Sequence, residues 1–403
     1  MHICFIAIDF HAEKSGGGIA SYINTIGQEF IRQGHHVTVI SKGLRHVEFD
    51  YESMRIIQIP LGNLHWYLYK TQVLSCFSLP VREIEWSLAI NKCLQTILKS
   101  SDIDLIEGCE TGGLFLNWLP QLPPVAIRLH GESYVFQKYS GHRIQLGAKI
   151  NRKLEYRVLA KAAGVSSPSV CQAQVVASEM RWTLNQITVI PNPIHPQFIS
   201  ADTTDYSCHN ENRQMVLYTG RIERSKGALT LLRSIPFVTR YFPDIEFILA
   251  GARHNSINDQ QLSEVVNQDD IREHARLLGH ISWSELIEWY RKASIFVMPS
   301  FYETFCISVI EAMVMGLPVV ASNAGALPEI VEDNVTGLLF EPGDSLALAD
   351  AIIRLLKDPE LAKRMGAEGK KRVLRLYTPS QVAAQTLSFY TKILHEHLLA
   401  GTR

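Results

Sequence analysis

The stretch MPSFYETFCISVIEAMVMGLPVVASNAGALPEIV, residues 298–331, does most to decide the fold of this chain. It begins at the end of an apolar run, residues 294–298, that is typical of a buried strand. Residues 306–315 then have the apolar spacing of a helix, which ends at Gly316, and residues 317–321 predict a second strand. A strand–loop–helix–strand unit builds a parallel sheet, and open sheets of this kind bind ligands outside the carboxyl ends of their strands.

Two glutamates of this unit are placed where they could face one ligand. Glu303 lies in the turn after the first strand, and Glu311 lies eight residues further on, down the helix. Eight helical residues rise about 12 Å. That exceeds the carboxyl separation of about 5–5.5 Å in retaining glycosidases and of about 6.5–9.5 Å in inverting ones. The spacing suits an extended ligand, such as a nucleotide sugar, whose diphosphate would face the N–H groups of the helix start.

Strand-like and helix-like segments alternate along the chain, which predicts an α/β protein with parallel sheets covered by helices. Strands are expected at 2–9, 36–41, 54–60, 103–108, 124–130, 164–168, 187–190, 215–219, 245–250, 277–280, 294–298, 317–321 and 337–340. Helices are expected near 18–33, 81–99, 145–162, 171–182, 227–240, 284–292, 306–315 and 345–356, with more helix to about 376 and a last one from 382 to about 397. The polar stretch 196–213 predicts a linker or an exposed excursion.

Composition sets limits on the class of protein. The chain has 403 residues, of which 46% are hydrophobic and 20% charged, as in an ordinary globular protein of two or three domains. A net charge of −1 does not indicate a nucleic-acid binder. Seven scattered cysteines without a C-x-x-C pair indicate neither a disulfide framework nor a zinc site. The amino terminus predicts a strand and not a secretory signal, so we expect a cytoplasmic protein that is at most peripheral at the inner membrane face.

The pattern P-S-x-x-E-x-F-x-x-x-x-x-E-A-M-x-x-G-x-P-V-V-A-S, followed by PEIV and TGLLF, resembles the retaining glycosyltransferases of group 1, or family 4. The resemblance covers nearly the whole chain and is strongest from Tyr218 to Pro342. It implies the GT-B architecture of two facing Rossmann-like domains. Residues 1–195 plus about 378–403 would form an acceptor-binding domain, and residues 196–377 a donor-binding domain. The last helix would cross back onto the first domain.

The resemblance also implies roles within the opening stretch. Glu303 would contact hydroxyls of the donor sugar, and Glu311 would accept hydrogen bonds from the ribose hydroxyls. Backbone N–H groups of the next four residues would meet the sugar and phosphate, namely those of Thr304, Phe305, Cys306 and Ile307. The alternative is that both acids are surface charges of a helix. Many relatives have Gly where this chain has Cys306, so a side chain would enter the pocket, and the identity of the donor sugar stays open.

A second motif, YTGRIERSKGALTLL at 218–232, places two cations between an expected strand and a helix. Arg221 and Lys226 beside a helix start make a phosphate site, although a lone pair of such residues is by default solvated. The segment matches the family motif G-R-x-x-x-x-K-G. The resemblance therefore assigns Arg221 and Lys226 to the donor diphosphate.

The glycine-rich segment KSGGGIAS at 14–21 follows the first strand and can expose backbone N–H groups to a ligand. A dinucleotide fingerprint fails here, because Ser21 replaces its last glycine and Ser41 and Lys42 stand where an acid is needed. The resemblance places Gly17 and Gly18 as backbone donors near the donor diphosphate or the acceptor. A tight strand–helix turn is the alternative.

His130 follows an apolar strand in AIRLHGES. A lone histidine is usually structural, but the family places a histidine after a strand of the first domain, facing the donor sugar and phosphate. The resemblance therefore gives His130 a catalytic role.

Two further segments have a surface character. Residues 64–77 cluster Trp66, Tyr67, Tyr69 and Phe77, for which we expect core packing, with an acceptor-binding or membrane-facing lip as the alternative. Residues 143–162 are basic on one face and apolar on another. We expect a plain amphipathic surface helix there, with binding to anionic lipid as the alternative.

The resemblance predicts transfer of a sugar, with retention, from a nucleotide sugar such as a UDP- or GDP-sugar to a carbohydrate, lipid-linked or small-molecule acceptor. The catalytic set would be His130, Arg221, Lys226 and Glu303. We expect no metal cofactor, on the interpretation that the chain has no Asp-x-Asp metal signature, and the two cations would replace Mg²⁺. An epimerase or a phosphorylase on the same two-domain plan is an alternative, although a phosphorylase would usually need pyridoxal phosphate on a lysine. A non-catalytic nucleotide-sugar-binding subunit is another, against which the intact Arg, Lys and Glu set argues.

Overall fold

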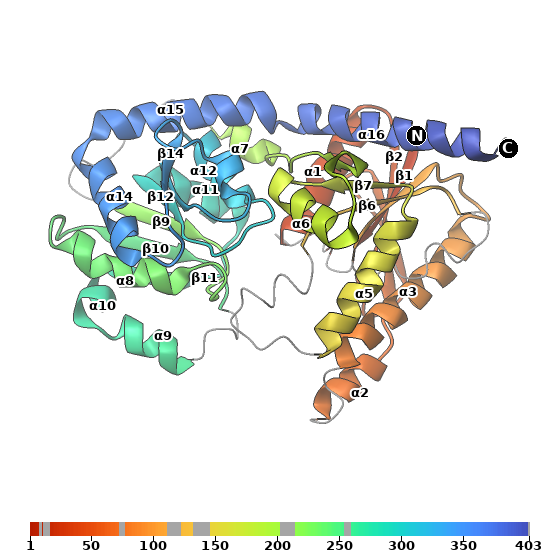
Figure 1. Ribbon diagram of the computed structural model, residues 1–403, viewed down its shortest axis with the longest axis horizontal. Coiled ribbons are helices and arrows are strands. Elements are labelled where there is room, and N and C mark those ends of the chain that lie inside the picture. Colours follow the sequence, from red (N-terminus) through yellow and green to blue (C-terminus); the bar gives the residue numbers. More distant parts are fainter. Residues whose placement is uncertain are drawn as a thin grey trace. The chain divides into compact units, whose positions relative to one another are not determined.

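The computed structural model describes residues 1–7, 10, 17–71, 77–110, 122–131, 146–201, 214–253 and 259–401 (Figure 1). These residues form two compact units. The amino-terminal unit takes the described residues up to Pro193 and again from Pro379, and the carboxyl-terminal unit takes those from Ile194 to Thr378. Each unit is an open sheet with helices packed on it.

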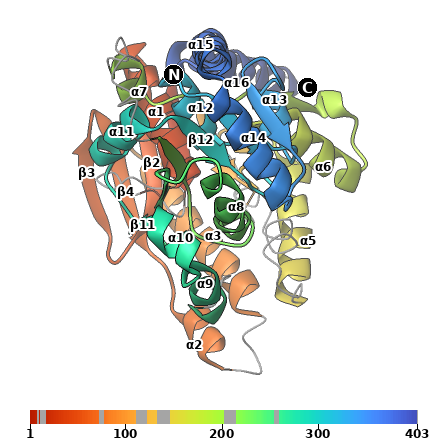
Figure 2. The same cartoon turned by 90° about the vertical axis from the view of Figure 1, so that its left-hand side faces the viewer.

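The sheet of the amino-terminal unit has the strand order β3-β4-β2-β1-β5-β6-β7-β8. Its strands are β1 (His2–Ala7), β2 (His36–Gly43), β3 (Val47–Tyr51), β4 (Met54–Pro60), β5 (Leu105–Cys109), β6 (Val125–Arg128), β7 (Gly164–Ser167) and β8 (Ile187–Val189). All neighbouring strands run parallel except β3 and β4. The predicted parallel sheet is confirmed, and an antiparallel β3–β4 hairpin that the sequence did not predict extends it at one edge (Figure 2).

Helices cover both faces of this sheet. They are α1 (Gly18–Arg32), α2 (Leu64–Lys70), α3 (Ser78–Ile97), α5 (Leu146–Lys161), α6 (Val170–Met180) and α16 (Pro379–Gly401). Alternate residues of a strand face opposite sides of a sheet. Thus Ile3 and Phe5 of β1 join the core under α1 and α16, whereas Cys4 and Ile6 join the core under α3 and α5.

Helix α2 corrects one expectation. We predicted core packing for the aromatic residues of 64–77, but none of the residues of α2 is buried. Trp66, Tyr67 and Tyr69 are 50%, 64% and 70% exposed, and Phe77 is 37% exposed. Residues 72–76 of this segment lie outside the described residues.

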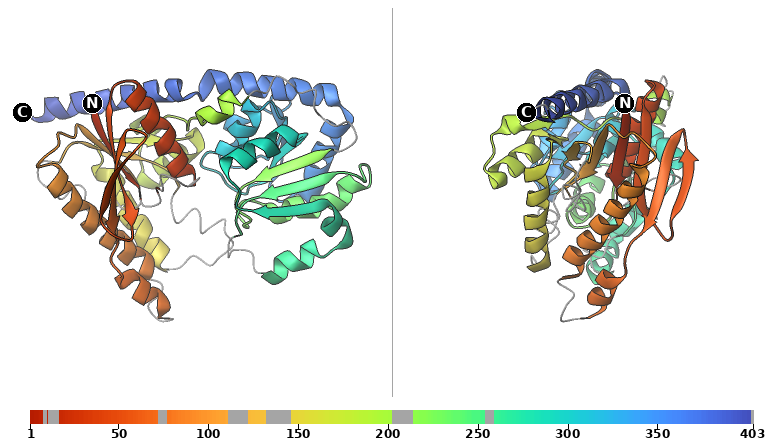
Figure 3. Two further views of the ribbon diagram at one scale, coloured as in Figure 1. Left: turned by 180° about the vertical axis from the view of Figure 1, so that it is seen from behind. Right: turned by 90° about the vertical axis from the view of Figure 1, so that its right-hand side faces the viewer.

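The carboxyl-terminal helix α16 belongs to the amino-terminal unit, as the resemblance implied. It lies beside α1 (Figure 3). The hydroxyl of Tyr390 donates a 2.6 Å hydrogen bond to Oε2 of Glu107 on β5. Gly164 of β7 lies against this helix, because a Cβ there would lie 2.6 Å from Cδ1 of Ile393, which would have to shift. The chain therefore enters this unit twice.

The sheet of the carboxyl-terminal unit is parallel throughout, with the order β11-β10-β9-β12-β13-β14. The strands are β9 (Met215–Thr219), β10 (Glu246–Ala250), β11 (Ala275–Gly279), β12 (Ile295–Met298), β13 (Val319–Ser322) and β14 (Gly337–Phe340). The helices are α7 (Pro196–Ser200), α8 (Ala228–Thr239), α9 (Asp259–Val266), α10 (Asp269–His274), α11 (Trp283–Lys292), α12 (Ile307–Val314), α13 (Leu327–Ile330), α14 (Ser345–Lys357) and α15 (Pro359–Leu376). The predicted linker thus begins with a helix, α7, and residues 202–213 lie outside the described residues.

Strand order fixes where a ligand would bind in this unit. The chain lays β10 and β11 on one side of β9 and then returns to lay β12, β13 and β14 on the other. The order therefore reverses between β9 and β12. In open α/β sheets, ligands bind in the crevice outside the carboxyl ends of the strands at such a point.

Candidate functional site

The loops that leave β9 and β12 meet at this switch point. The backbone N–H of Phe301 donates to the carbonyl of Ser225 at 2.8 Å. Gly227 has φ +69°, and a Cβ on it would lie 1.8 Å from the carbonyl oxygen of Pro299. Only glycine allows the two loops this approach. The two sequence motifs are therefore in backbone contact.

Lys226 and Glu303 form an ion pair across these loops. Nζ of Lys226 lies 2.8 Å from both carboxylate oxygens of Glu303, and the hydroxyl of Ser300 donates to Oε1 of Glu303 at 2.7 Å. Glu303 is only 5% exposed. Burial by itself lowers the pKa of Lys226, but the Glu303 carboxylate together with the neighbouring Cys306 and Glu223 side chains raises it. Lys226 is therefore a cation, and the sequence did not predict that it pairs with Glu303.

Arg221 follows the end of β9 and lies in the same loop as Lys226. Its side chain is 46% exposed, and its Nη2 lies 3.2 Å from Oε1 of Glu223. Glu223 is buried and also accepts a 2.7 Å hydrogen bond from the hydroxyl of Ser225. A buried acid thus holds one side of the Arg221 guanidinium.

Helix α12 begins next to the ion pair. Its N-cap residue, Cys306, has an extended backbone, and no side chain caps the helix. The side chains of Phe305 and Cys306 are buried in the apolar core of the unit. At Phe305 and Cys306 it is therefore the backbone, and not the side chain, that is left at the start of the helix. The dipole of the helix adds positive potential at this end.

Glu311 lies further along α12 and is also buried, at 8% exposed. Its Oε2 accepts a 2.9 Å hydrogen bond from the hydroxyl of Tyr290, whose oxygen lies 3.0 Å from Oγ1 of Thr219 at the end of β9. Burial raises the pKa of Glu311 to about 7, although the Tyr290 hydrogen bond acts in the opposite direction. Tyr290 was not predicted, because it comes from α11 and no local motif marks it.

In the amino-terminal unit, His130 follows the end of β6. The carboxylate of Glu110, which follows β5, accepts hydrogen bonds from the backbone N–H of His130 at 3.0 Å and of Gly131 at 2.6 Å. The ring of Tyr22 on α1 lies 5.7 Å from the imidazole. Burial and, next, the Arg128 guanidinium lower the pKa of His130 to about 3. His130 is therefore neutral near pH 7. Glu110 was also not predicted.

Gly17 and Gly18 are exposed at the start of α1, where Gly17 is the N-cap residue. Gly17 has φ −61°, and a Cβ on it would meet no atom within 4 Å. Its backbone therefore does not require glycine. Residues 14–16 of the predicted loop lie outside the described residues.

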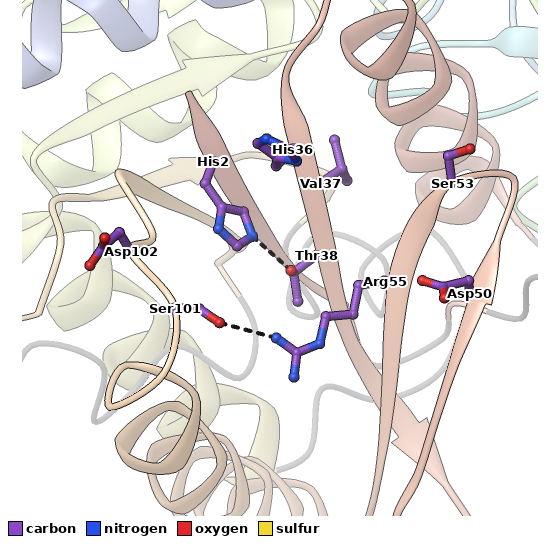
Figure 4. Close-up of a pocket in the computed structure, with 9 residues that line it drawn as sticks. All are labelled: His2, His36, Val37, Thr38, Asp50, Ser53, Arg55, Ser101 and Asp102. Atoms are coloured by element: carbon purple, nitrogen blue, oxygen red, sulfur yellow. Dashed lines mark hydrogen bonds between the residues drawn. The ribbon is translucent and has the colours of Figure 1, made fainter.

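A cavity of about 380 Å³ lies at the opposite edge of the same sheet, at the amino ends of β1 and β2 (Figure 4). Its lining includes His2, whose ring lies 2.8 Å from Thr38 Oγ1, and Arg55, which donates to the hydroxyl of Ser101 at 3.2 Å. It also includes Asp102 but none of the predicted site residues. Asp102 and Asp104 form an Asp-x-Asp triplet, so the interpretation that the chain has none is wrong; the triplet lies at this edge and not among the predicted site residues. Within the described residues, no three His, Cys, Asp or Glu side chains are grouped to hold a metal, and no helix has the length and apolarity to span a membrane.

Two α/β units, a returning terminal helix and an ion pair with a helix start at the switch point together define the GT-B class of transferases. The family of glycosyl transferases group 1 matches residues 205–372, and glycosyltransferase family 4 matches residues 16–198. The chain therefore belongs to the group 1 glycosyltransferases.

Similar proteins include several enzymes of sugar transfer. Alpha-D-kanosaminyltransferase of Streptomyces kanamyceticus is 25% identical over 67% of this chain and 71% of its own length. Alpha-maltose-1-phosphate synthase of Mycolicibacterium smegmatis is 33% identical over 45% of this chain, which spans only 49% of that relative. Among solved structures, sucrose-phosphate synthase from Thermosynechococcus elongatus has a TM-score of 0.81 at 23% identity, covering 98% of this chain and 100% of its own. Anabaena HepE in complex with UDP-glucose has a TM-score of 0.70 at 18% identity, covering 96% and 99%.

Proposed function

We propose that this enzyme transfers a sugar, with retention of configuration and without a metal, from a nucleotide diphosphate sugar to an acceptor hydroxyl. One observation carries the proposal. The Lys226–Glu303 ion pair, Arg221 and the start of α12 converge at the switch point of one sheet. A cation paired with an acid there can meet the two chemically different parts of a nucleotide sugar, its diphosphate and its hydroxyls.

The electrostatics support a diphosphate donor. In the proposed reaction, negative charge builds on the departing diphosphate. Arg221, Lys226 and the amino end of α12 are fixed sources of positive potential beside it, which stabilise that charge without reorganisation. The similar structure of HepE holds UDP-glucose, which supports the same class of donor for this chain.

The environment of Glu303 supports a front-face transfer. Its carboxylate faces the ammonium of Lys226 and accepts a hydrogen bond from Ser300. Such partners stabilise the negative charge and lower the nucleophilicity of the oxygens. We therefore assign Glu303 to donor hydroxyls and let the leaving phosphate accept the proton of the acceptor. Glu311 accepts hydrogen bonds from the ribose hydroxyls.

His130 has a different proposed role. Because its imidazole is neutral near pH 7, it serves as a hydrogen-bonding group toward the sugar or phosphate rather than as a cation. Glu110 fixes the backbone that carries it.

The test begins with a panel of UDP-, GDP- and ADP-sugars. A true donor at 100 times its Kd should stabilise the protein by about 2.7 kcal/mol. With that donor at saturation, Arg221→Ala and Lys226→Ala should each lower turnover by about 10²–10³-fold, as loss of one such electrostatic donor does. Lys363→Ala, an exposed cation of α15, should leave turnover unchanged. Near-wild-type turnover of Arg221→Ala would refute the electrostatic mechanism.

The same assay separates the alternatives. A transferase releases nucleotide in step with glycosylated acceptor. The product should keep the anomeric configuration of the donor, and turnover should persist in EDTA. An epimerase needs no acceptor, and a binding subunit would be stabilised by donor without any turnover. An inverted product or a requirement for divalent metal would contradict the corresponding part of the proposal.

A further inference from the structure

We propose that the amino-terminal unit docks on an anionic lipid bilayer through α2 and the exposed stripes of α3 and α5, which together we call the docking face. One part of this proposal rests on the proposed function, namely that the acceptor of the sugar is lipid-linked and is presented at that bilayer.

Helix α2 presents large apolar and aromatic side chains to solvent. Leu64 is 57% exposed, and Trp66, Tyr67 and Tyr69 are 50–70% exposed. Single exposed hydrophobic residues are normal, but four within one short helix are not: Trp66 and Tyr69, three residues apart, share one side of α2, and Leu64 and Tyr67 share another. Trp and Tyr are the residues that favour the membrane–water interface. The ammonium of Lys70 lies 3.5 Å from the centroid of the Trp66 ring.

The structure holds this helix in place. Both carboxylate oxygens of Glu85 on α3 bind the start of α2, Oε1 accepting from the backbone N–H of Leu64 at 2.9 Å and Oε2 lying 2.6 Å from Nδ1 of His65. The aromatic residues are therefore displayed on an anchored element.

The neighbouring helix α3 also presents exposed apolar side chains, along one line. Ile84, Leu88 and Lys92 follow at intervals of four residues and are all exposed, with Ile84 and Leu88 at 37% and 58%. Its acids do not face solvent as free charges, because Glu83 is 1% exposed and Glu85 is bound to α2. The exposed stripe is therefore apolar near α2 and cationic beyond it.

Helix α5 packs against α3 and repeats this order. Figure 1 shows α5 running next to α3, with α2 at the end of α3. Leu146 is 56% exposed at the start of α5, and Lys149, Lys153 and Arg157 follow as exposed cations. The acid of α5, Glu155, is 2% exposed. The exposed charges of α2, α3 and α5 within the described residues are therefore all positive.

The charge pattern decides the occupant. The cores of protein–protein interfaces are depleted in Lys, so a second copy or another protein would not give the exposed cations of these helices favourable partners. An anionic bilayer suits both the aromatic residues and the cations. Its interface favours Trp and Tyr, and its surface potential attracts Lys and Arg.

Topology places the docking face near the acceptor side of the unit. Helix α2 follows the carboxyl end of β4, and both His130 and α5 follow the carboxyl end of β6. Since β4 and β6 both belong to the parallel part of the sheet, these ends lie at one edge. A lipid-linked acceptor held at the bilayer would thus be presented at the edge that carries His130.

Co-sedimentation of the full chain with vesicles, in the absence of any donor, tests the proposal. Vesicles of equimolar phosphatidylcholine and phosphatidylglycerol should bind the protein, and vesicles of phosphatidylcholine alone should bind it far more weakly. Each Lys lost near an anionic surface weakens binding about fivefold. Lys149→Glu with Lys153→Glu should therefore weaken binding by at least about 25-fold. Trp66→Ser with Tyr69→Ser should weaken it to both kinds of vesicle.

Two variants of the carboxyl-terminal unit are matched controls. Lys363→Glu with Arg364→Glu reverses two exposed cations of α15. Tyr241→Ser removes a 60% exposed ring that also carries a lysine, Lys357, 4.3 Å from its centroid. Both controls should bind vesicles as the wild type does. Equal losses in the controls and the docking-face variants, or no binding of the wild type to anionic vesicles, would overturn the proposal.

Size-exclusion chromatography tests whether a second copy of the chain is the occupant instead. If Trp66→Ser with Tyr69→Ser dissociates a dimer while vesicle binding is unchanged, the lipid proposal is wrong. The donor-induced thermal shift of every variant should equal that of the wild type. Failure of the docking proposal is thus distinguishable from failure of the proposed function, which would abolish the shift in all proteins and leave vesicle binding intact.

Discussion

At the scale of single residues, Glu311 is held near its titration point by burial. Its pKa in the folded protein is about 7, above the value of 4.5 for the free side chain. The folded state therefore binds this proton more tightly than the unfolded state. The stabilisation is complete below pH 4.5 and is lost as the pH rises through 7. Above neutral pH an ionised, buried carboxylate remains, which is what an acceptor for ribose hydroxyls requires.

Glu311→Gln should therefore stabilise the protein without ligand at pH 8 and change little at pH 4.5. Gln keeps an acceptor for Tyr290 and removes the buried charge, so we expect a gain on the order of 2 kcal/mol at pH 8. The same variant should lose most of the donor-induced thermal shift, because an amide replaces the carboxylate. Urea unfolding at the two pH values, with and without donor, measures both effects. Glu288→Gln, on the exposed face of α11, is the control. A variant equally destabilised at both pH values would contradict this explanation.

At the scale of elements, the loop after β13 contacts the backbone of Glu303. The backbone N–H of Ala326 donates to the carbonyl oxygen of Glu303 at 2.9 Å. Gly325 has φ +55°, and a Cβ on it would lie 2.3 Å from the same carbonyl oxygen. The position of the acid therefore depends on a glycine that follows another strand.

Gly325→Ala should lower turnover strongly and lower the free energy of unfolding moderately. The positive φ costs about 1–3 kcal/mol for a residue with a side chain. The clash also moves Glu303, and a displacement of about 1 Å at a reacting centre can cost about 10²-fold in rate. Gly279→Ala is the matched control, because Gly279 has φ +72° but a Cβ there meets nothing within 4 Å. It should lose similar stability and keep its turnover. Equal turnover of the two variants would show that Gly325 does not position Glu303.

Elements with their own periodicity were predictable from sequence, and those defined by their neighbours were not. The strands and helix of the opening stretch, β12, α12 and β13, lie within about two residues of the predicted bounds. The β3–β4 hairpin was missed because its turn uses Glu52 and Ser53 at positive φ, where an Asn-Gly or Asp-Gly pair would have been a signal. Helix α2 was missed because its aromatic residues indicated a core.

In the candidate site, too, residues that lie in local motifs could be predicted from the sequence, and contacts that depend on the fold could not. Lys226 and Glu303 lie in local motifs, so each could be named from the sequence. Their pairing depends on β9 and β12 becoming neighbours, which joins residues 77 positions apart. Tyr290 and Glu110 carry no local pattern. Their contacts with Glu311 and with the backbone of His130 exist only in the folded sheet.

At the scale of the whole molecule, the amino-terminal unit is completed by the last helix of the chain. Tyr390 of α16 and Glu107 of β5 are 283 residues apart in sequence and share a 2.6 Å hydrogen bond. Val382, Ala383, Tyr390 and Ile393 are buried in the core that α16 shares with α1. This core can therefore close only after the carboxyl-terminal unit has been synthesised.

Tyr390→Ala should consequently destabilise the amino-terminal unit and spare the other. Loss of a fully buried aromatic ring costs about 3–5 kcal/mol, and Glu107 loses a hydrogen-bond donor in a buried site. Hydrogen exchange followed by mass spectrometry should show reduced protection in β1 and β5–β8, with β9–β14 unchanged. Tyr390→Phe keeps the ring and should have a smaller effect of about 1–3 kcal/mol, and Leu399→Ala, at a 56% exposed position of α16, should have almost none. Because donor binding is assigned to the carboxyl-terminal unit, Tyr390→Ala should retain its donor-induced thermal shift. Equal loss of protection in both sheets would mean that the two units unfold together and that α16 does not act on one alone.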